Sequence, residues 1–123
     1  MKKERMSTMV KPRRGEVWLV RFPFTDLTST KLRPALVWAV HGEDIIVLGI
    51  FSRVPAGTLR KSWLLIEDQH SDFSQIGLKK TSVVKAEKIA VVHESVFQKK
   101  LGSLPTKVMV QVQKALEGAL LIS

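Results

Sequence analysis

The amino-acid sequence predicts a small, mainly β protein: a curled antiparallel barrel with one C-terminal helix packed on it. Three observations predict this fold. The chain has 123 residues, short apolar stretches alternate with polar segments, and apolar residues recur at helical spacing near the C-terminus. A chain of this length has room for a single core. Many short strands followed by one amphipathic helix are typical of a small barrel.

The first half of the chain predicts three strands. Residues 16–22 alternate and are apolar on both faces, which indicates a strand near the core. Residues 35–40 form a second, buried strand. Residues 41–44 form a hairpin turn that leads into a third apolar strand at residues 45–51.

The second half predicts shorter elements. Residues 63–66 form a fourth strand, and residues 68–77 are irregular or contain a single helical turn. Residues 82–92 are β-rich, residues 93–97 predict a short turn of helix, and residues 99–104 predict a last strand.

The C-terminal segment predicts an amphipathic helix. Pro105 opens it, because the missing N–H and fixed φ of proline are tolerated at a helix start. Gly118 weakens the helix by about 1 kcal/mol relative to Ala. The apolar stripe that would face the sheet has roughly helical spacing and consists of Val108, Val112, Leu116 and Ala119.

The charge is strongly positive and unevenly distributed. The net charge is +9, and more than half of the excess lies in residues 1–14. We expect residues 1–13 to form a flexible basic arm, followed by a single domain at residues 14–123. Positive charge of this size favours a polyanionic partner, either nucleic acid or an acidic protein.

Several classes of site are excluded or disfavoured by the residues that the sequence lacks. Cysteine is absent, which excludes disulfides, thiolate nucleophiles and cysteine-zinc sites. The three histidines lack the spacing of metal ligands, so we expect neither a metal nor a cofactor. No apolar run is long enough to span a membrane, and we expect no signal peptide because the basic first residues are followed by polar ones. We therefore expect a cytoplasmic protein without a membrane partner.

Two polar loops that follow apolar strands contain the candidate site. They span residues 25–33 and 52–62 and are rich in Arg, Lys, Ser and Thr. Arg33 directly precedes a proline at a strand start, where a rigidly held guanidinium can bind a phosphate through two hydrogen bonds. Ser52 and Arg53 follow the end of a strand. If the two loops meet in space, they form a cationic pocket of the size of a phosphate.

A pocket of this kind can cleave RNA without a metal. The 2′-hydroxyl attacks the adjacent phosphorus, so the site must accept its proton, stabilise the phosphorane oxygens and protonate the departing 5′ oxygen. Arg and hydroxyl donors stabilise the charge, but a free Arg is a poor base because its pKa lies above about 12. Four other titratable residues are candidates for assisting the proton transfer: Glu16, Asp26, His70 and Glu87.

Each of these residue types also has an ordinary structural interpretation. Taken alone, Arg33 is more often part of a surface salt bridge, Ser52 of a strand-end hydrogen bond, and His70 of a surface cluster. The tryptophans lie inside predicted strands, which favours core packing over base stacking for Trp18, Trp38 and Trp63. Composition and spacing alone therefore predict a basic small barrel for which RNA is a candidate partner.

Three motifs occur in order near the N-terminus. Residues 14–20 read RGEVWLV, residues 22–26 read FPFTD and residues 31–37 read KLRPALV. Together they resemble the opening of MazF/PemK-type toxins of type II toxin–antitoxin systems. In that family an RG-[DE]-[IV]-W strand and a polar loop precede an RP-[AV]-L-V strand. The resemblance continues more weakly to the C-terminus and covers about residues 13–121.

The resemblance implies a small Src-homology-3-like β-barrel, the CcdB/MazF/PemK toxin fold, that forms homodimers. It also implies a sequence-selective, metal-independent endoribonuclease (mRNA interferase) that inhibits translation and growth. Such enzymes cleave single-stranded RNA and leave a 2′,3′-cyclic phosphate and a 5′-hydroxyl. Carried over by position, Arg33 acts in proton transfer and Ser52 stabilises the transition state.

The same resemblance implies two kinds of partner. One is the RNA substrate, and the other is a cognate acidic antitoxin whose disordered tail covers the RNA groove by imitating phosphates. The residues expected to contact RNA lie in the two polar loops and in the β-rich segment that follows them: Thr25, Asp26, Lys31, Arg53, Arg60, Lys61, Glu87 and Lys88.

Three positions depart from the family's pattern. Ser52 stands where Thr is commoner, which keeps the hydroxyl but loosens its rotamer. Lys88 follows Glu87 where Gln is usual, and Ala90 stands where a basic residue is frequent. These departures affect base recognition more than the cleavage step.

Two other functions are open at the level of sequence. A gyrase poison of the CcdB type has the same fold and binds its target through aromatic and small residues at its C-terminus. Residues 119–123 contain no Trp, which argues against this function. A non-catalytic RNA-binding barrel, a decayed toxin, would bind single-stranded RNA with a steep salt dependence and yield no cleaved product.

Overall fold

The computed structural model describes residues 11–21 and 31–122 of the chain. The elements follow one another in this order: β1 (Glu16–Arg21), β2 (Leu32–His41), β3 (Asp44–Phe51), β4 (Trp63–Ile66), α2 (Phe73–Ile76), β5 (Ser82–His93), the 3₁₀ turn η1 (Glu94–Val96), β6 (Phe97–Ser103) and α3 (Thr106–Ala119).

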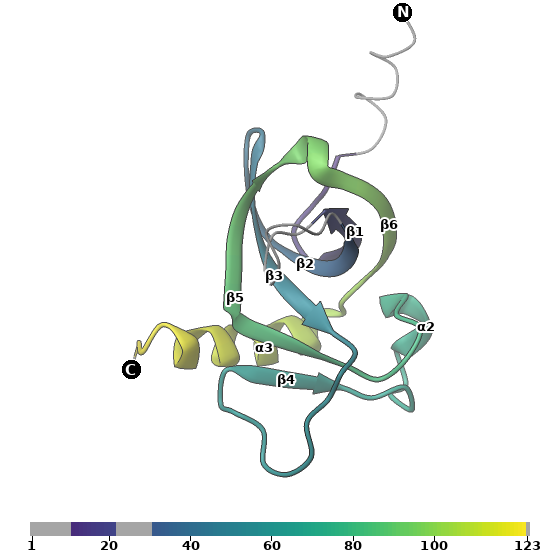
Figure 1. Cartoon of the computed structure of the whole chain (residues 1–123), viewed down its shortest axis with the longest axis vertical. Helices are drawn as coiled ribbons and strands as arrows, with labels where there is room; N and C mark the ends of the chain where they lie inside the picture. Colours follow the sequence, from purple (N-terminus) through teal and green to yellow (C-terminus); the bar gives the residue numbers. More distant parts are fainter. Residues whose placement is uncertain (1–10, 22–30, 123) are drawn as a thin grey trace, which may run out of the picture.

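The strands form one antiparallel sheet in the order β4-β5-β3-β2-β1-β6. The sheet curls into a barrel in which β5 and β6 wrap around β1, β2 and β3, while β4 extends the sheet beyond the barrel (Figure 1). The predicted fold, mainly β with a C-terminal helix, is confirmed. The predicted strands also agree with the observed ones within a few residues.

The main difference between predicted and observed strands lies at the start of β2. This strand begins at Leu32, because Leu32, Arg33 and Pro34 pair with the second half of β1. Arg33, predicted at the end of a loop, is therefore fixed within a strand opposite Val20.

Buried side chains form two clusters, one on each face of the sheet, and not the single core that the chain length predicts. The cluster inside the barrel contains Trp18, Val20, Ala35, Val37, Ile45 and Val47. The larger cluster lies between the other face and the helices, and its largest members include Leu36, Leu48, Ile50, Ile66, Ile76, Val112 and Leu116. Alternate residues of β1, β2 and β3 contribute to opposite clusters, which explains why these strands are apolar on both faces.

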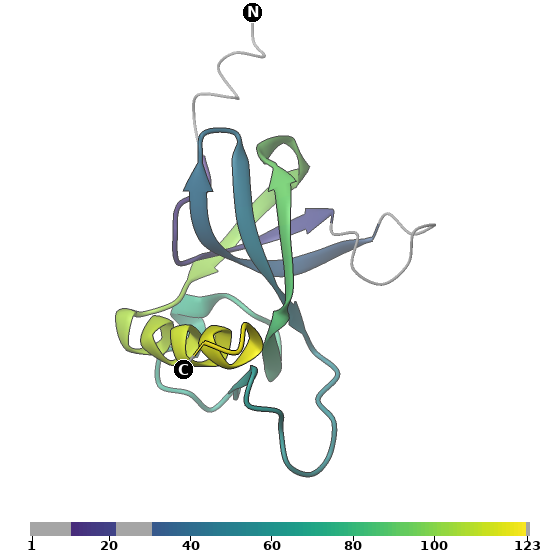
Figure 2. The ribbon, with the colours of Figure 1, turned by 90° about the vertical axis from the view of Figure 1, so that its left-hand side faces the viewer.

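The C-terminal helix crosses one end of the sheet (Figure 2). Pro105 directly precedes α3, as predicted, and the stripe of Val108, Val112 and Leu116 is buried against the sheet. Gly118 lies near the loop between β3 and β4, since a Cβ atom there would be 3.7 Å from Cβ of Lys61. No helix in residues 11–21 or 31–122 is long and apolar enough to cross a membrane.

Two glycines allow α2 to pack closely on β6. A Cβ atom on Gly77 would overlap the carbonyl of Leu101, and one on Gly102 would overlap the carbonyl of Gln75. Gly77 also ends α2 with a φ of 83°, a left-handed conformation that favours glycine. These contacts fix the long connection between β4 and β5.

Strand β5 changes direction at its middle. Lys85 pairs with Gly49 of β3, whereas the next paired residue of β3, Leu48, is opposite Ile89. Residues 86–88 of β5 therefore have no partner on β3, and the backbone N–H of Ala86 donates instead to the Ser62 carbonyl at 2.8 Å. A bulge of this kind bends a strand and redirects its side chains. It places Glu87 and Lys88 at a corner of the barrel.

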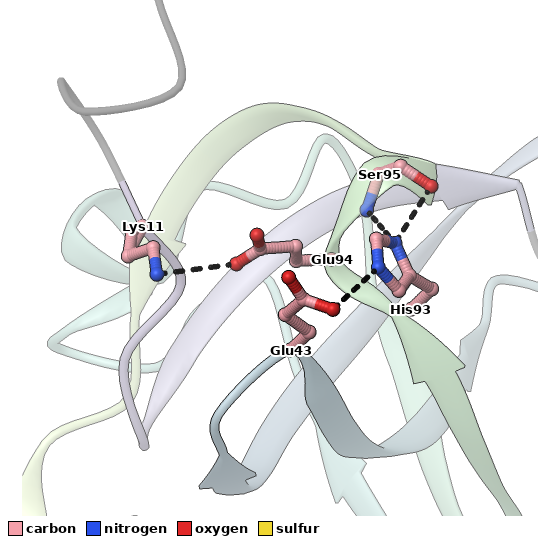
Figure 3. A network of polar contacts seen from close by, with 5 residues as sticks. All are labelled: Lys11, Glu43, His93, Glu94 and Ser95. Atoms are coloured by element: carbon pink, nitrogen blue, oxygen red, sulfur yellow. Dashed lines mark hydrogen bonds and ion pairs between the residues drawn. The ribbon is translucent and has the colours of Figure 1, made fainter. Parts of the chain in front are cut away.

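A polar network closes the end of the barrel that is far from α3 (Figure 3). His93 Nε2 lies 3.3 Å from Glu43 Oε1, and His93 Nδ1 accepts a hydrogen bond from the Ser95 backbone N–H at 3.0 Å. Lys11 forms an ion pair with Glu94 at 3.5 Å. These contacts join residue 11 and the β2–β3 hairpin to η1, so the network is structural.

Candidate nucleic-acid interface

The paired strands β2 and β3 bring Arg33 and Ser52 to the same end of the sheet. Their register includes Ala35 opposite Gly49. Continuing this register by two residues sets Arg33 opposite Phe51, and Ser52 directly follows Phe51. The Arg33 side chain is half-buried and that of Ser52 is exposed. In the part of the chain that the structure describes, neither side chain forms a hydrogen bond or ion pair.

Glu87 is the acceptor at the centre of a second group of side chains. Ser62 Oγ donates a hydrogen bond to Glu87 Oε1 at 2.7 Å, and Trp63 Nε1 donates to Oε2 at 2.7 Å. A guanidinium nitrogen of Arg60 lies 3.4 Å from the same Oε2 atom. These three donors come from the end of the β3–β4 loop and the start of β4. They attach this loop to the bulge of β5.

This environment determines the ionisation of Glu87. Partial burial alone would raise its pKa, but the hydrogen bonds from Trp63 and Ser62 and the charge of Arg60 outweigh burial and lower the pKa below its ordinary value of 4.5. Both carboxylate oxygens already accept hydrogen bonds. Glu87 is therefore a stable anion that orients its neighbours, and it is poorly suited to accept a proton.

Lys85, on the same strand as Glu87, lies between an aromatic ring of β3 and one of β4. Its Nζ atom is 4.7 Å from the ring centroid of Phe51 and 4.6 Å from that of Trp63. The guanidinium carbon of Arg60 is 5.0 Å from the Trp63 ring centroid. Trp63 therefore contacts two cations through its ring and one carboxylate through its N–H group.

These residues share one face of the sheet. Ala35 is opposite Gly49, Gly49 is opposite Lys85, and Lys85 is opposite Trp63. Opposed residues of antiparallel strands project to the same face, as do residues two apart along a strand. Arg33, two residues from Ala35, therefore lies on the face that carries Lys85 and Trp63. The geometry provides several cations and a hydroxyl on one exposed end of the sheet, an arrangement suited to an anionic chain.

A family model described as "PemK-like, MazF-like toxin of type II toxin-antitoxin system" matches residues 13–120. The match includes Arg33 and Ser52, the Glu87 cluster and α3. The chain belongs to this toxin family. The resemblance inferred from the N-terminal motifs is thereby confirmed.

Solved structures similar to this PemK/MazF toxin have the same fold. An endoribonuclease from mycobacterial species has a TM-score of 0.67 and 22% sequence identity, over 92% of this chain and 94% of that chain. An endoribonuclease in complex with its cognate antitoxin, also from mycobacterial species, has a TM-score of 0.68 and 21% identity, over 91% and 97% of the two chains. A MazF from Deinococcus radiodurans has a TM-score of 0.65 and 20% identity, over 90% and 97%. A search of curated proteins gave no match.

The remaining predicted contact residues of the PemK/MazF toxin are spread around this end of the sheet. Lys31, Arg53 and Lys61 are exposed, and Lys88 is half-buried at the bulge of β5. Thr25 and Asp26 lie outside the described residues. The structure thus brings both predicted loops, at their described ends, to one region of this family member.

Two of the candidates for proton transfer lie elsewhere in the toxin. Glu16 is at the opposite end of β1 from Val20, the partner of Arg33, and it accepts a hydrogen bond from Trp18 Nε1 at 2.9 Å. His70 precedes α2 and accepts a hydrogen bond from the backbone N–H of Asp72 at 3.0 Å. Neither residue is positioned to serve the Arg33 region. In the described ranges, no three His, Asp or Glu side chains gather as metal ligands.

The three tryptophans have three different environments. Trp18 is 6% exposed inside the barrel, as predicted, and Trp38 is partly buried against the larger cluster. The prediction of a core position for Trp63 is wrong, because its ring is half-buried among charged groups. Sequence reasoning also missed Lys85. The alternation of residues 83–87 contained the necessary clue, since a lysine and a glutamate occupy successive positions on one face of a strand.

Proposed function

We propose that this PemK/MazF family toxin is a sequence-selective, metal-independent endoribonuclease that cleaves single-stranded mRNA and so inhibits translation and growth. The observation that carries this proposal is the placement of Arg33 and Ser52 at one end of β2 and β3. Neither is occupied by another side chain of the described residues. The relatives from mycobacterial species are themselves described as endoribonucleases, which supports the same activity.

The proposed reaction is an internal transfer at phosphorus. The 2′ oxygen forms a bond to the adjacent phosphorus and loses its proton, while the bond from phosphorus to the 5′ oxygen breaks and that oxygen gains a proton. The products are a 2′,3′-cyclic phosphate and a 5′-hydroxyl. Arg33 acts in proton transfer and binds the phosphorane oxygens, and the hydroxyl of Ser52 donates a further hydrogen bond to them. Glu87 orients Trp63 and Arg60 and takes no part as a base.

The RNA chain would lie along the exposed end of the sheet. Lys31, Arg53, Arg60, Lys61 and Lys88 provide the positive charge, and Thr25 and Asp26 belong to the adjoining loop. Contacts of cations with phosphates supply affinity and carry no sequence information. Base selection would therefore depend on the loop segments and on Lys88, which replaces the glutamine usual in the family.

The proposed partners follow from the same chemistry. A cognate antitoxin with an acidic segment would compete with RNA for the cationic face, and one relative has been solved in complex with its cognate antitoxin. We also propose a homodimer that buries a groove in which the apolar side chains of Trp38, Leu116, Leu120 and Ile122 lie beside Arg14 and Glu117. Sedimentation at micromolar concentration tests the dimer, and a monomer there would contradict it. The substrate implies that the toxin acts in the cytoplasm.

The function is tested with long single-stranded RNA in EDTA, followed by mapping of the 5′ ends of the fragments. We expect discrete cuts by the purified toxin and a loss of about a hundredfold or more in rate for Arg33→Ala. Lys114→Ala removes an exposed cation of α3 and serves as the matched control, with an unchanged rate. RNA that stays intact but bound would indicate a non-catalytic barrel. Intact, unbound RNA and loss of toxicity on deleting residues 121–123 would favour a gyrase poison.

A further inference from the structure

We propose that Lys85 is a phosphate-binding residue of this RNA site and that Trp63 is the positioning residue that holds it. The inference rests on the proposed function only in taking RNA as the ligand. It concerns a part of the face that neither the sequence motifs nor the expected contact residues include, namely the row formed by Gly49, Lys85 and Trp63.

The Lys85 ammonium is held in place without being neutralised. The rings of Phe51 and Trp63 lie 4.7 and 4.6 Å from Nζ, and such contacts restrict a flexible lysine while leaving its charge unpaired. Within the described residues, Lys85 forms no hydrogen bond or ion pair. A half-buried ammonium with three unused N–H donors is a ready site for an anion.

The nearest carboxylate on the same face of β5 cannot serve as that anion. Glu87 is two residues from Lys85, but its Oε1 atom accepts from Ser62 and its Oε2 atom accepts from Trp63 and Arg60. The Glu87 carboxylate is thus bound to residues at the end of the β3–β4 loop and the start of β4, and not to Lys85. Glu87 therefore leaves the Lys85 ammonium available to an anion that a ligand carries.

The position of Lys85 suits a phosphate close to the reacting one. Arg33 and Lys85 share a face and are separated by one strand, β3. Two strand spacings, roughly 10 Å, therefore lie between their backbones, and long side chains shorten the distance between the charges. An RNA strand with its scissile phosphate at Arg33 would therefore bring a neighbouring phosphate within reach of Lys85.

The same contacts argue against base stacking at this position. The Trp63 ring already has the cations of Lys85 and Arg60 over it, at 4.6 and 5.0 Å from its centroid. Its edge is fixed by the 2.7 Å hydrogen bond to Glu87. A base would have to displace these cations, whereas a phosphate would bind them. Trp63 thus positions cations and does not itself contact the RNA.

The test is equilibrium binding of a 2′-O-methyl oligonucleotide, in which the attacking hydroxyl is blocked, over a series of KCl concentrations. We expect Lys85→Met to bind roughly tenfold more weakly at low salt. The slope of log K against log salt should fall by about 0.7, the value for one lost contact to single-stranded nucleic acid. Lys85→Arg should retain the slope, and Lys114→Met, on α3, should match the wild type.

The variant Trp63→Phe tests whether Trp63 positions the cations or contacts the RNA itself. It keeps a ring beside Lys85 and removes the N–H donor to Glu87, so we expect weaker binding with an unchanged salt slope. An unchanged affinity and slope for Lys85→Met would overturn the inference. So would a Lys85→Met variant that loses affinity only for a polyglutamate peptide, because the anion would then be an acidic protein segment.

Cleavage by the wild type is scored separately from this binding. If the wild type cuts RNA and Lys85→Met binds RNA normally, the inference fails and the proposed function stands. If the wild type binds without cutting and Lys85→Met lowers the slope, the Lys85 contact stands and the proposed cleavage fails. Circular dichroism of each variant verifies that the fold is intact.

Discussion

Two tryptophan–glutamate pairs occur among the described residues, and they differ in what surrounds the ring. Trp18 Nε1 donates to Glu16 at 2.9 Å, and Trp63 Nε1 donates to Glu87 at 2.7 Å. Each carboxylate also has a cation beside it, since Lys100 lies 3.1 Å from Glu16 and Arg60 lies 3.4 Å from Glu87. The polar chemistry of the two pairs is therefore nearly the same.

The rings themselves have different neighbours. Trp18 is buried in the barrel and meets Phe97 edge to face, with 5.7 Å between ring centroids. Trp63 is half-buried and has Arg60 and Lys85 over its ring. A hydrogen bond of the same kind therefore fixes Trp18 in the core and holds Trp63 beside the cations Arg60 and Lys85. The difference supports our proposal that the second pair serves ligand binding, whereas the first pair serves stability.

Replacing each tryptophan by alanine gives the largest expected difference between the pairs. Trp18→Ala should lower the free energy of unfolding by about 3–5 kcal/mol, because it leaves a cavity in the barrel core. Trp63→Ala should lower it by about 1–2 kcal/mol. The same variant should lose more free energy of RNA binding than free energy of unfolding. Urea titrations give the first quantity, and binding to the blocked oligonucleotide gives the second. Equal losses of stability would mean that Trp63 is also a core residue.

Acid titration gives a smaller effect that the two pairs should share. For both glutamates, burial would raise the pKa, but the hydrogen bonds and cations lower it below 4.5. A lowered pKa contributes stability that is present above 4.5 and is lost as the pH falls through the folded value. Glu16→Gln and Glu87→Gln should each lower stability at pH 7 by roughly 1 kcal/mol and flatten its decline below pH 4.5.

The two variants should differ in RNA binding at neutral pH. Glu87→Gln weakens the contacts that hold Arg60 and Trp63, so the variant should bind the blocked oligonucleotide more weakly. Glu16 lies at the far end of β1, so Glu16→Gln should bind as the wild type does. Stability profiles measured by urea titration from pH 3 to pH 7 test the first part. A Glu16→Gln variant with altered RNA affinity would contradict the division into a structural and a binding pair.

The elements of the fold could be predicted from the sequence because their patterns are local. Alternation identified β1, short apolar or β-rich runs identified β2 to β5, and Pro105 with the stripe of Val108, Val112 and Leu116 identified α3. The two clusters could not be predicted from length alone. They arise because the sheet has a barrel on one face and helices on the other, which is a property of its curl.

The site was only partly predictable for a related reason. Arg33 and Ser52 adjoin strands that are consecutive in sequence, so the hairpin register brings them together. Lys85 joins them only because β5 pairs with β3 on one side and β4 on the other, a long-range pairing that no local pattern specifies. Trp63 was assigned to the core because its strand position favours burial, and its charged neighbours become evident only in three dimensions.

The smallest expected effect concerns α3, which lies behind the loop that leads to Trp63. Gly118 of α3 faces Lys61, which precedes Ser62 and Trp63, and a Cβ atom there would meet Lys61 at ordinary contact distances of 3.7 Å and more. Because Gly118 lies in the last turn of α3, Gly118→Ala should raise the free energy of unfolding by about 0.5 kcal/mol, less than the roughly 1 kcal/mol of a helix interior, and leave RNA affinity unchanged. If urea titration shows the gain but affinity falls, the methyl group has displaced the β3–β4 loop. The Trp63 pair would then depend on the position of α3, whereas the Trp18 pair, enclosed by β1 and β6, would not.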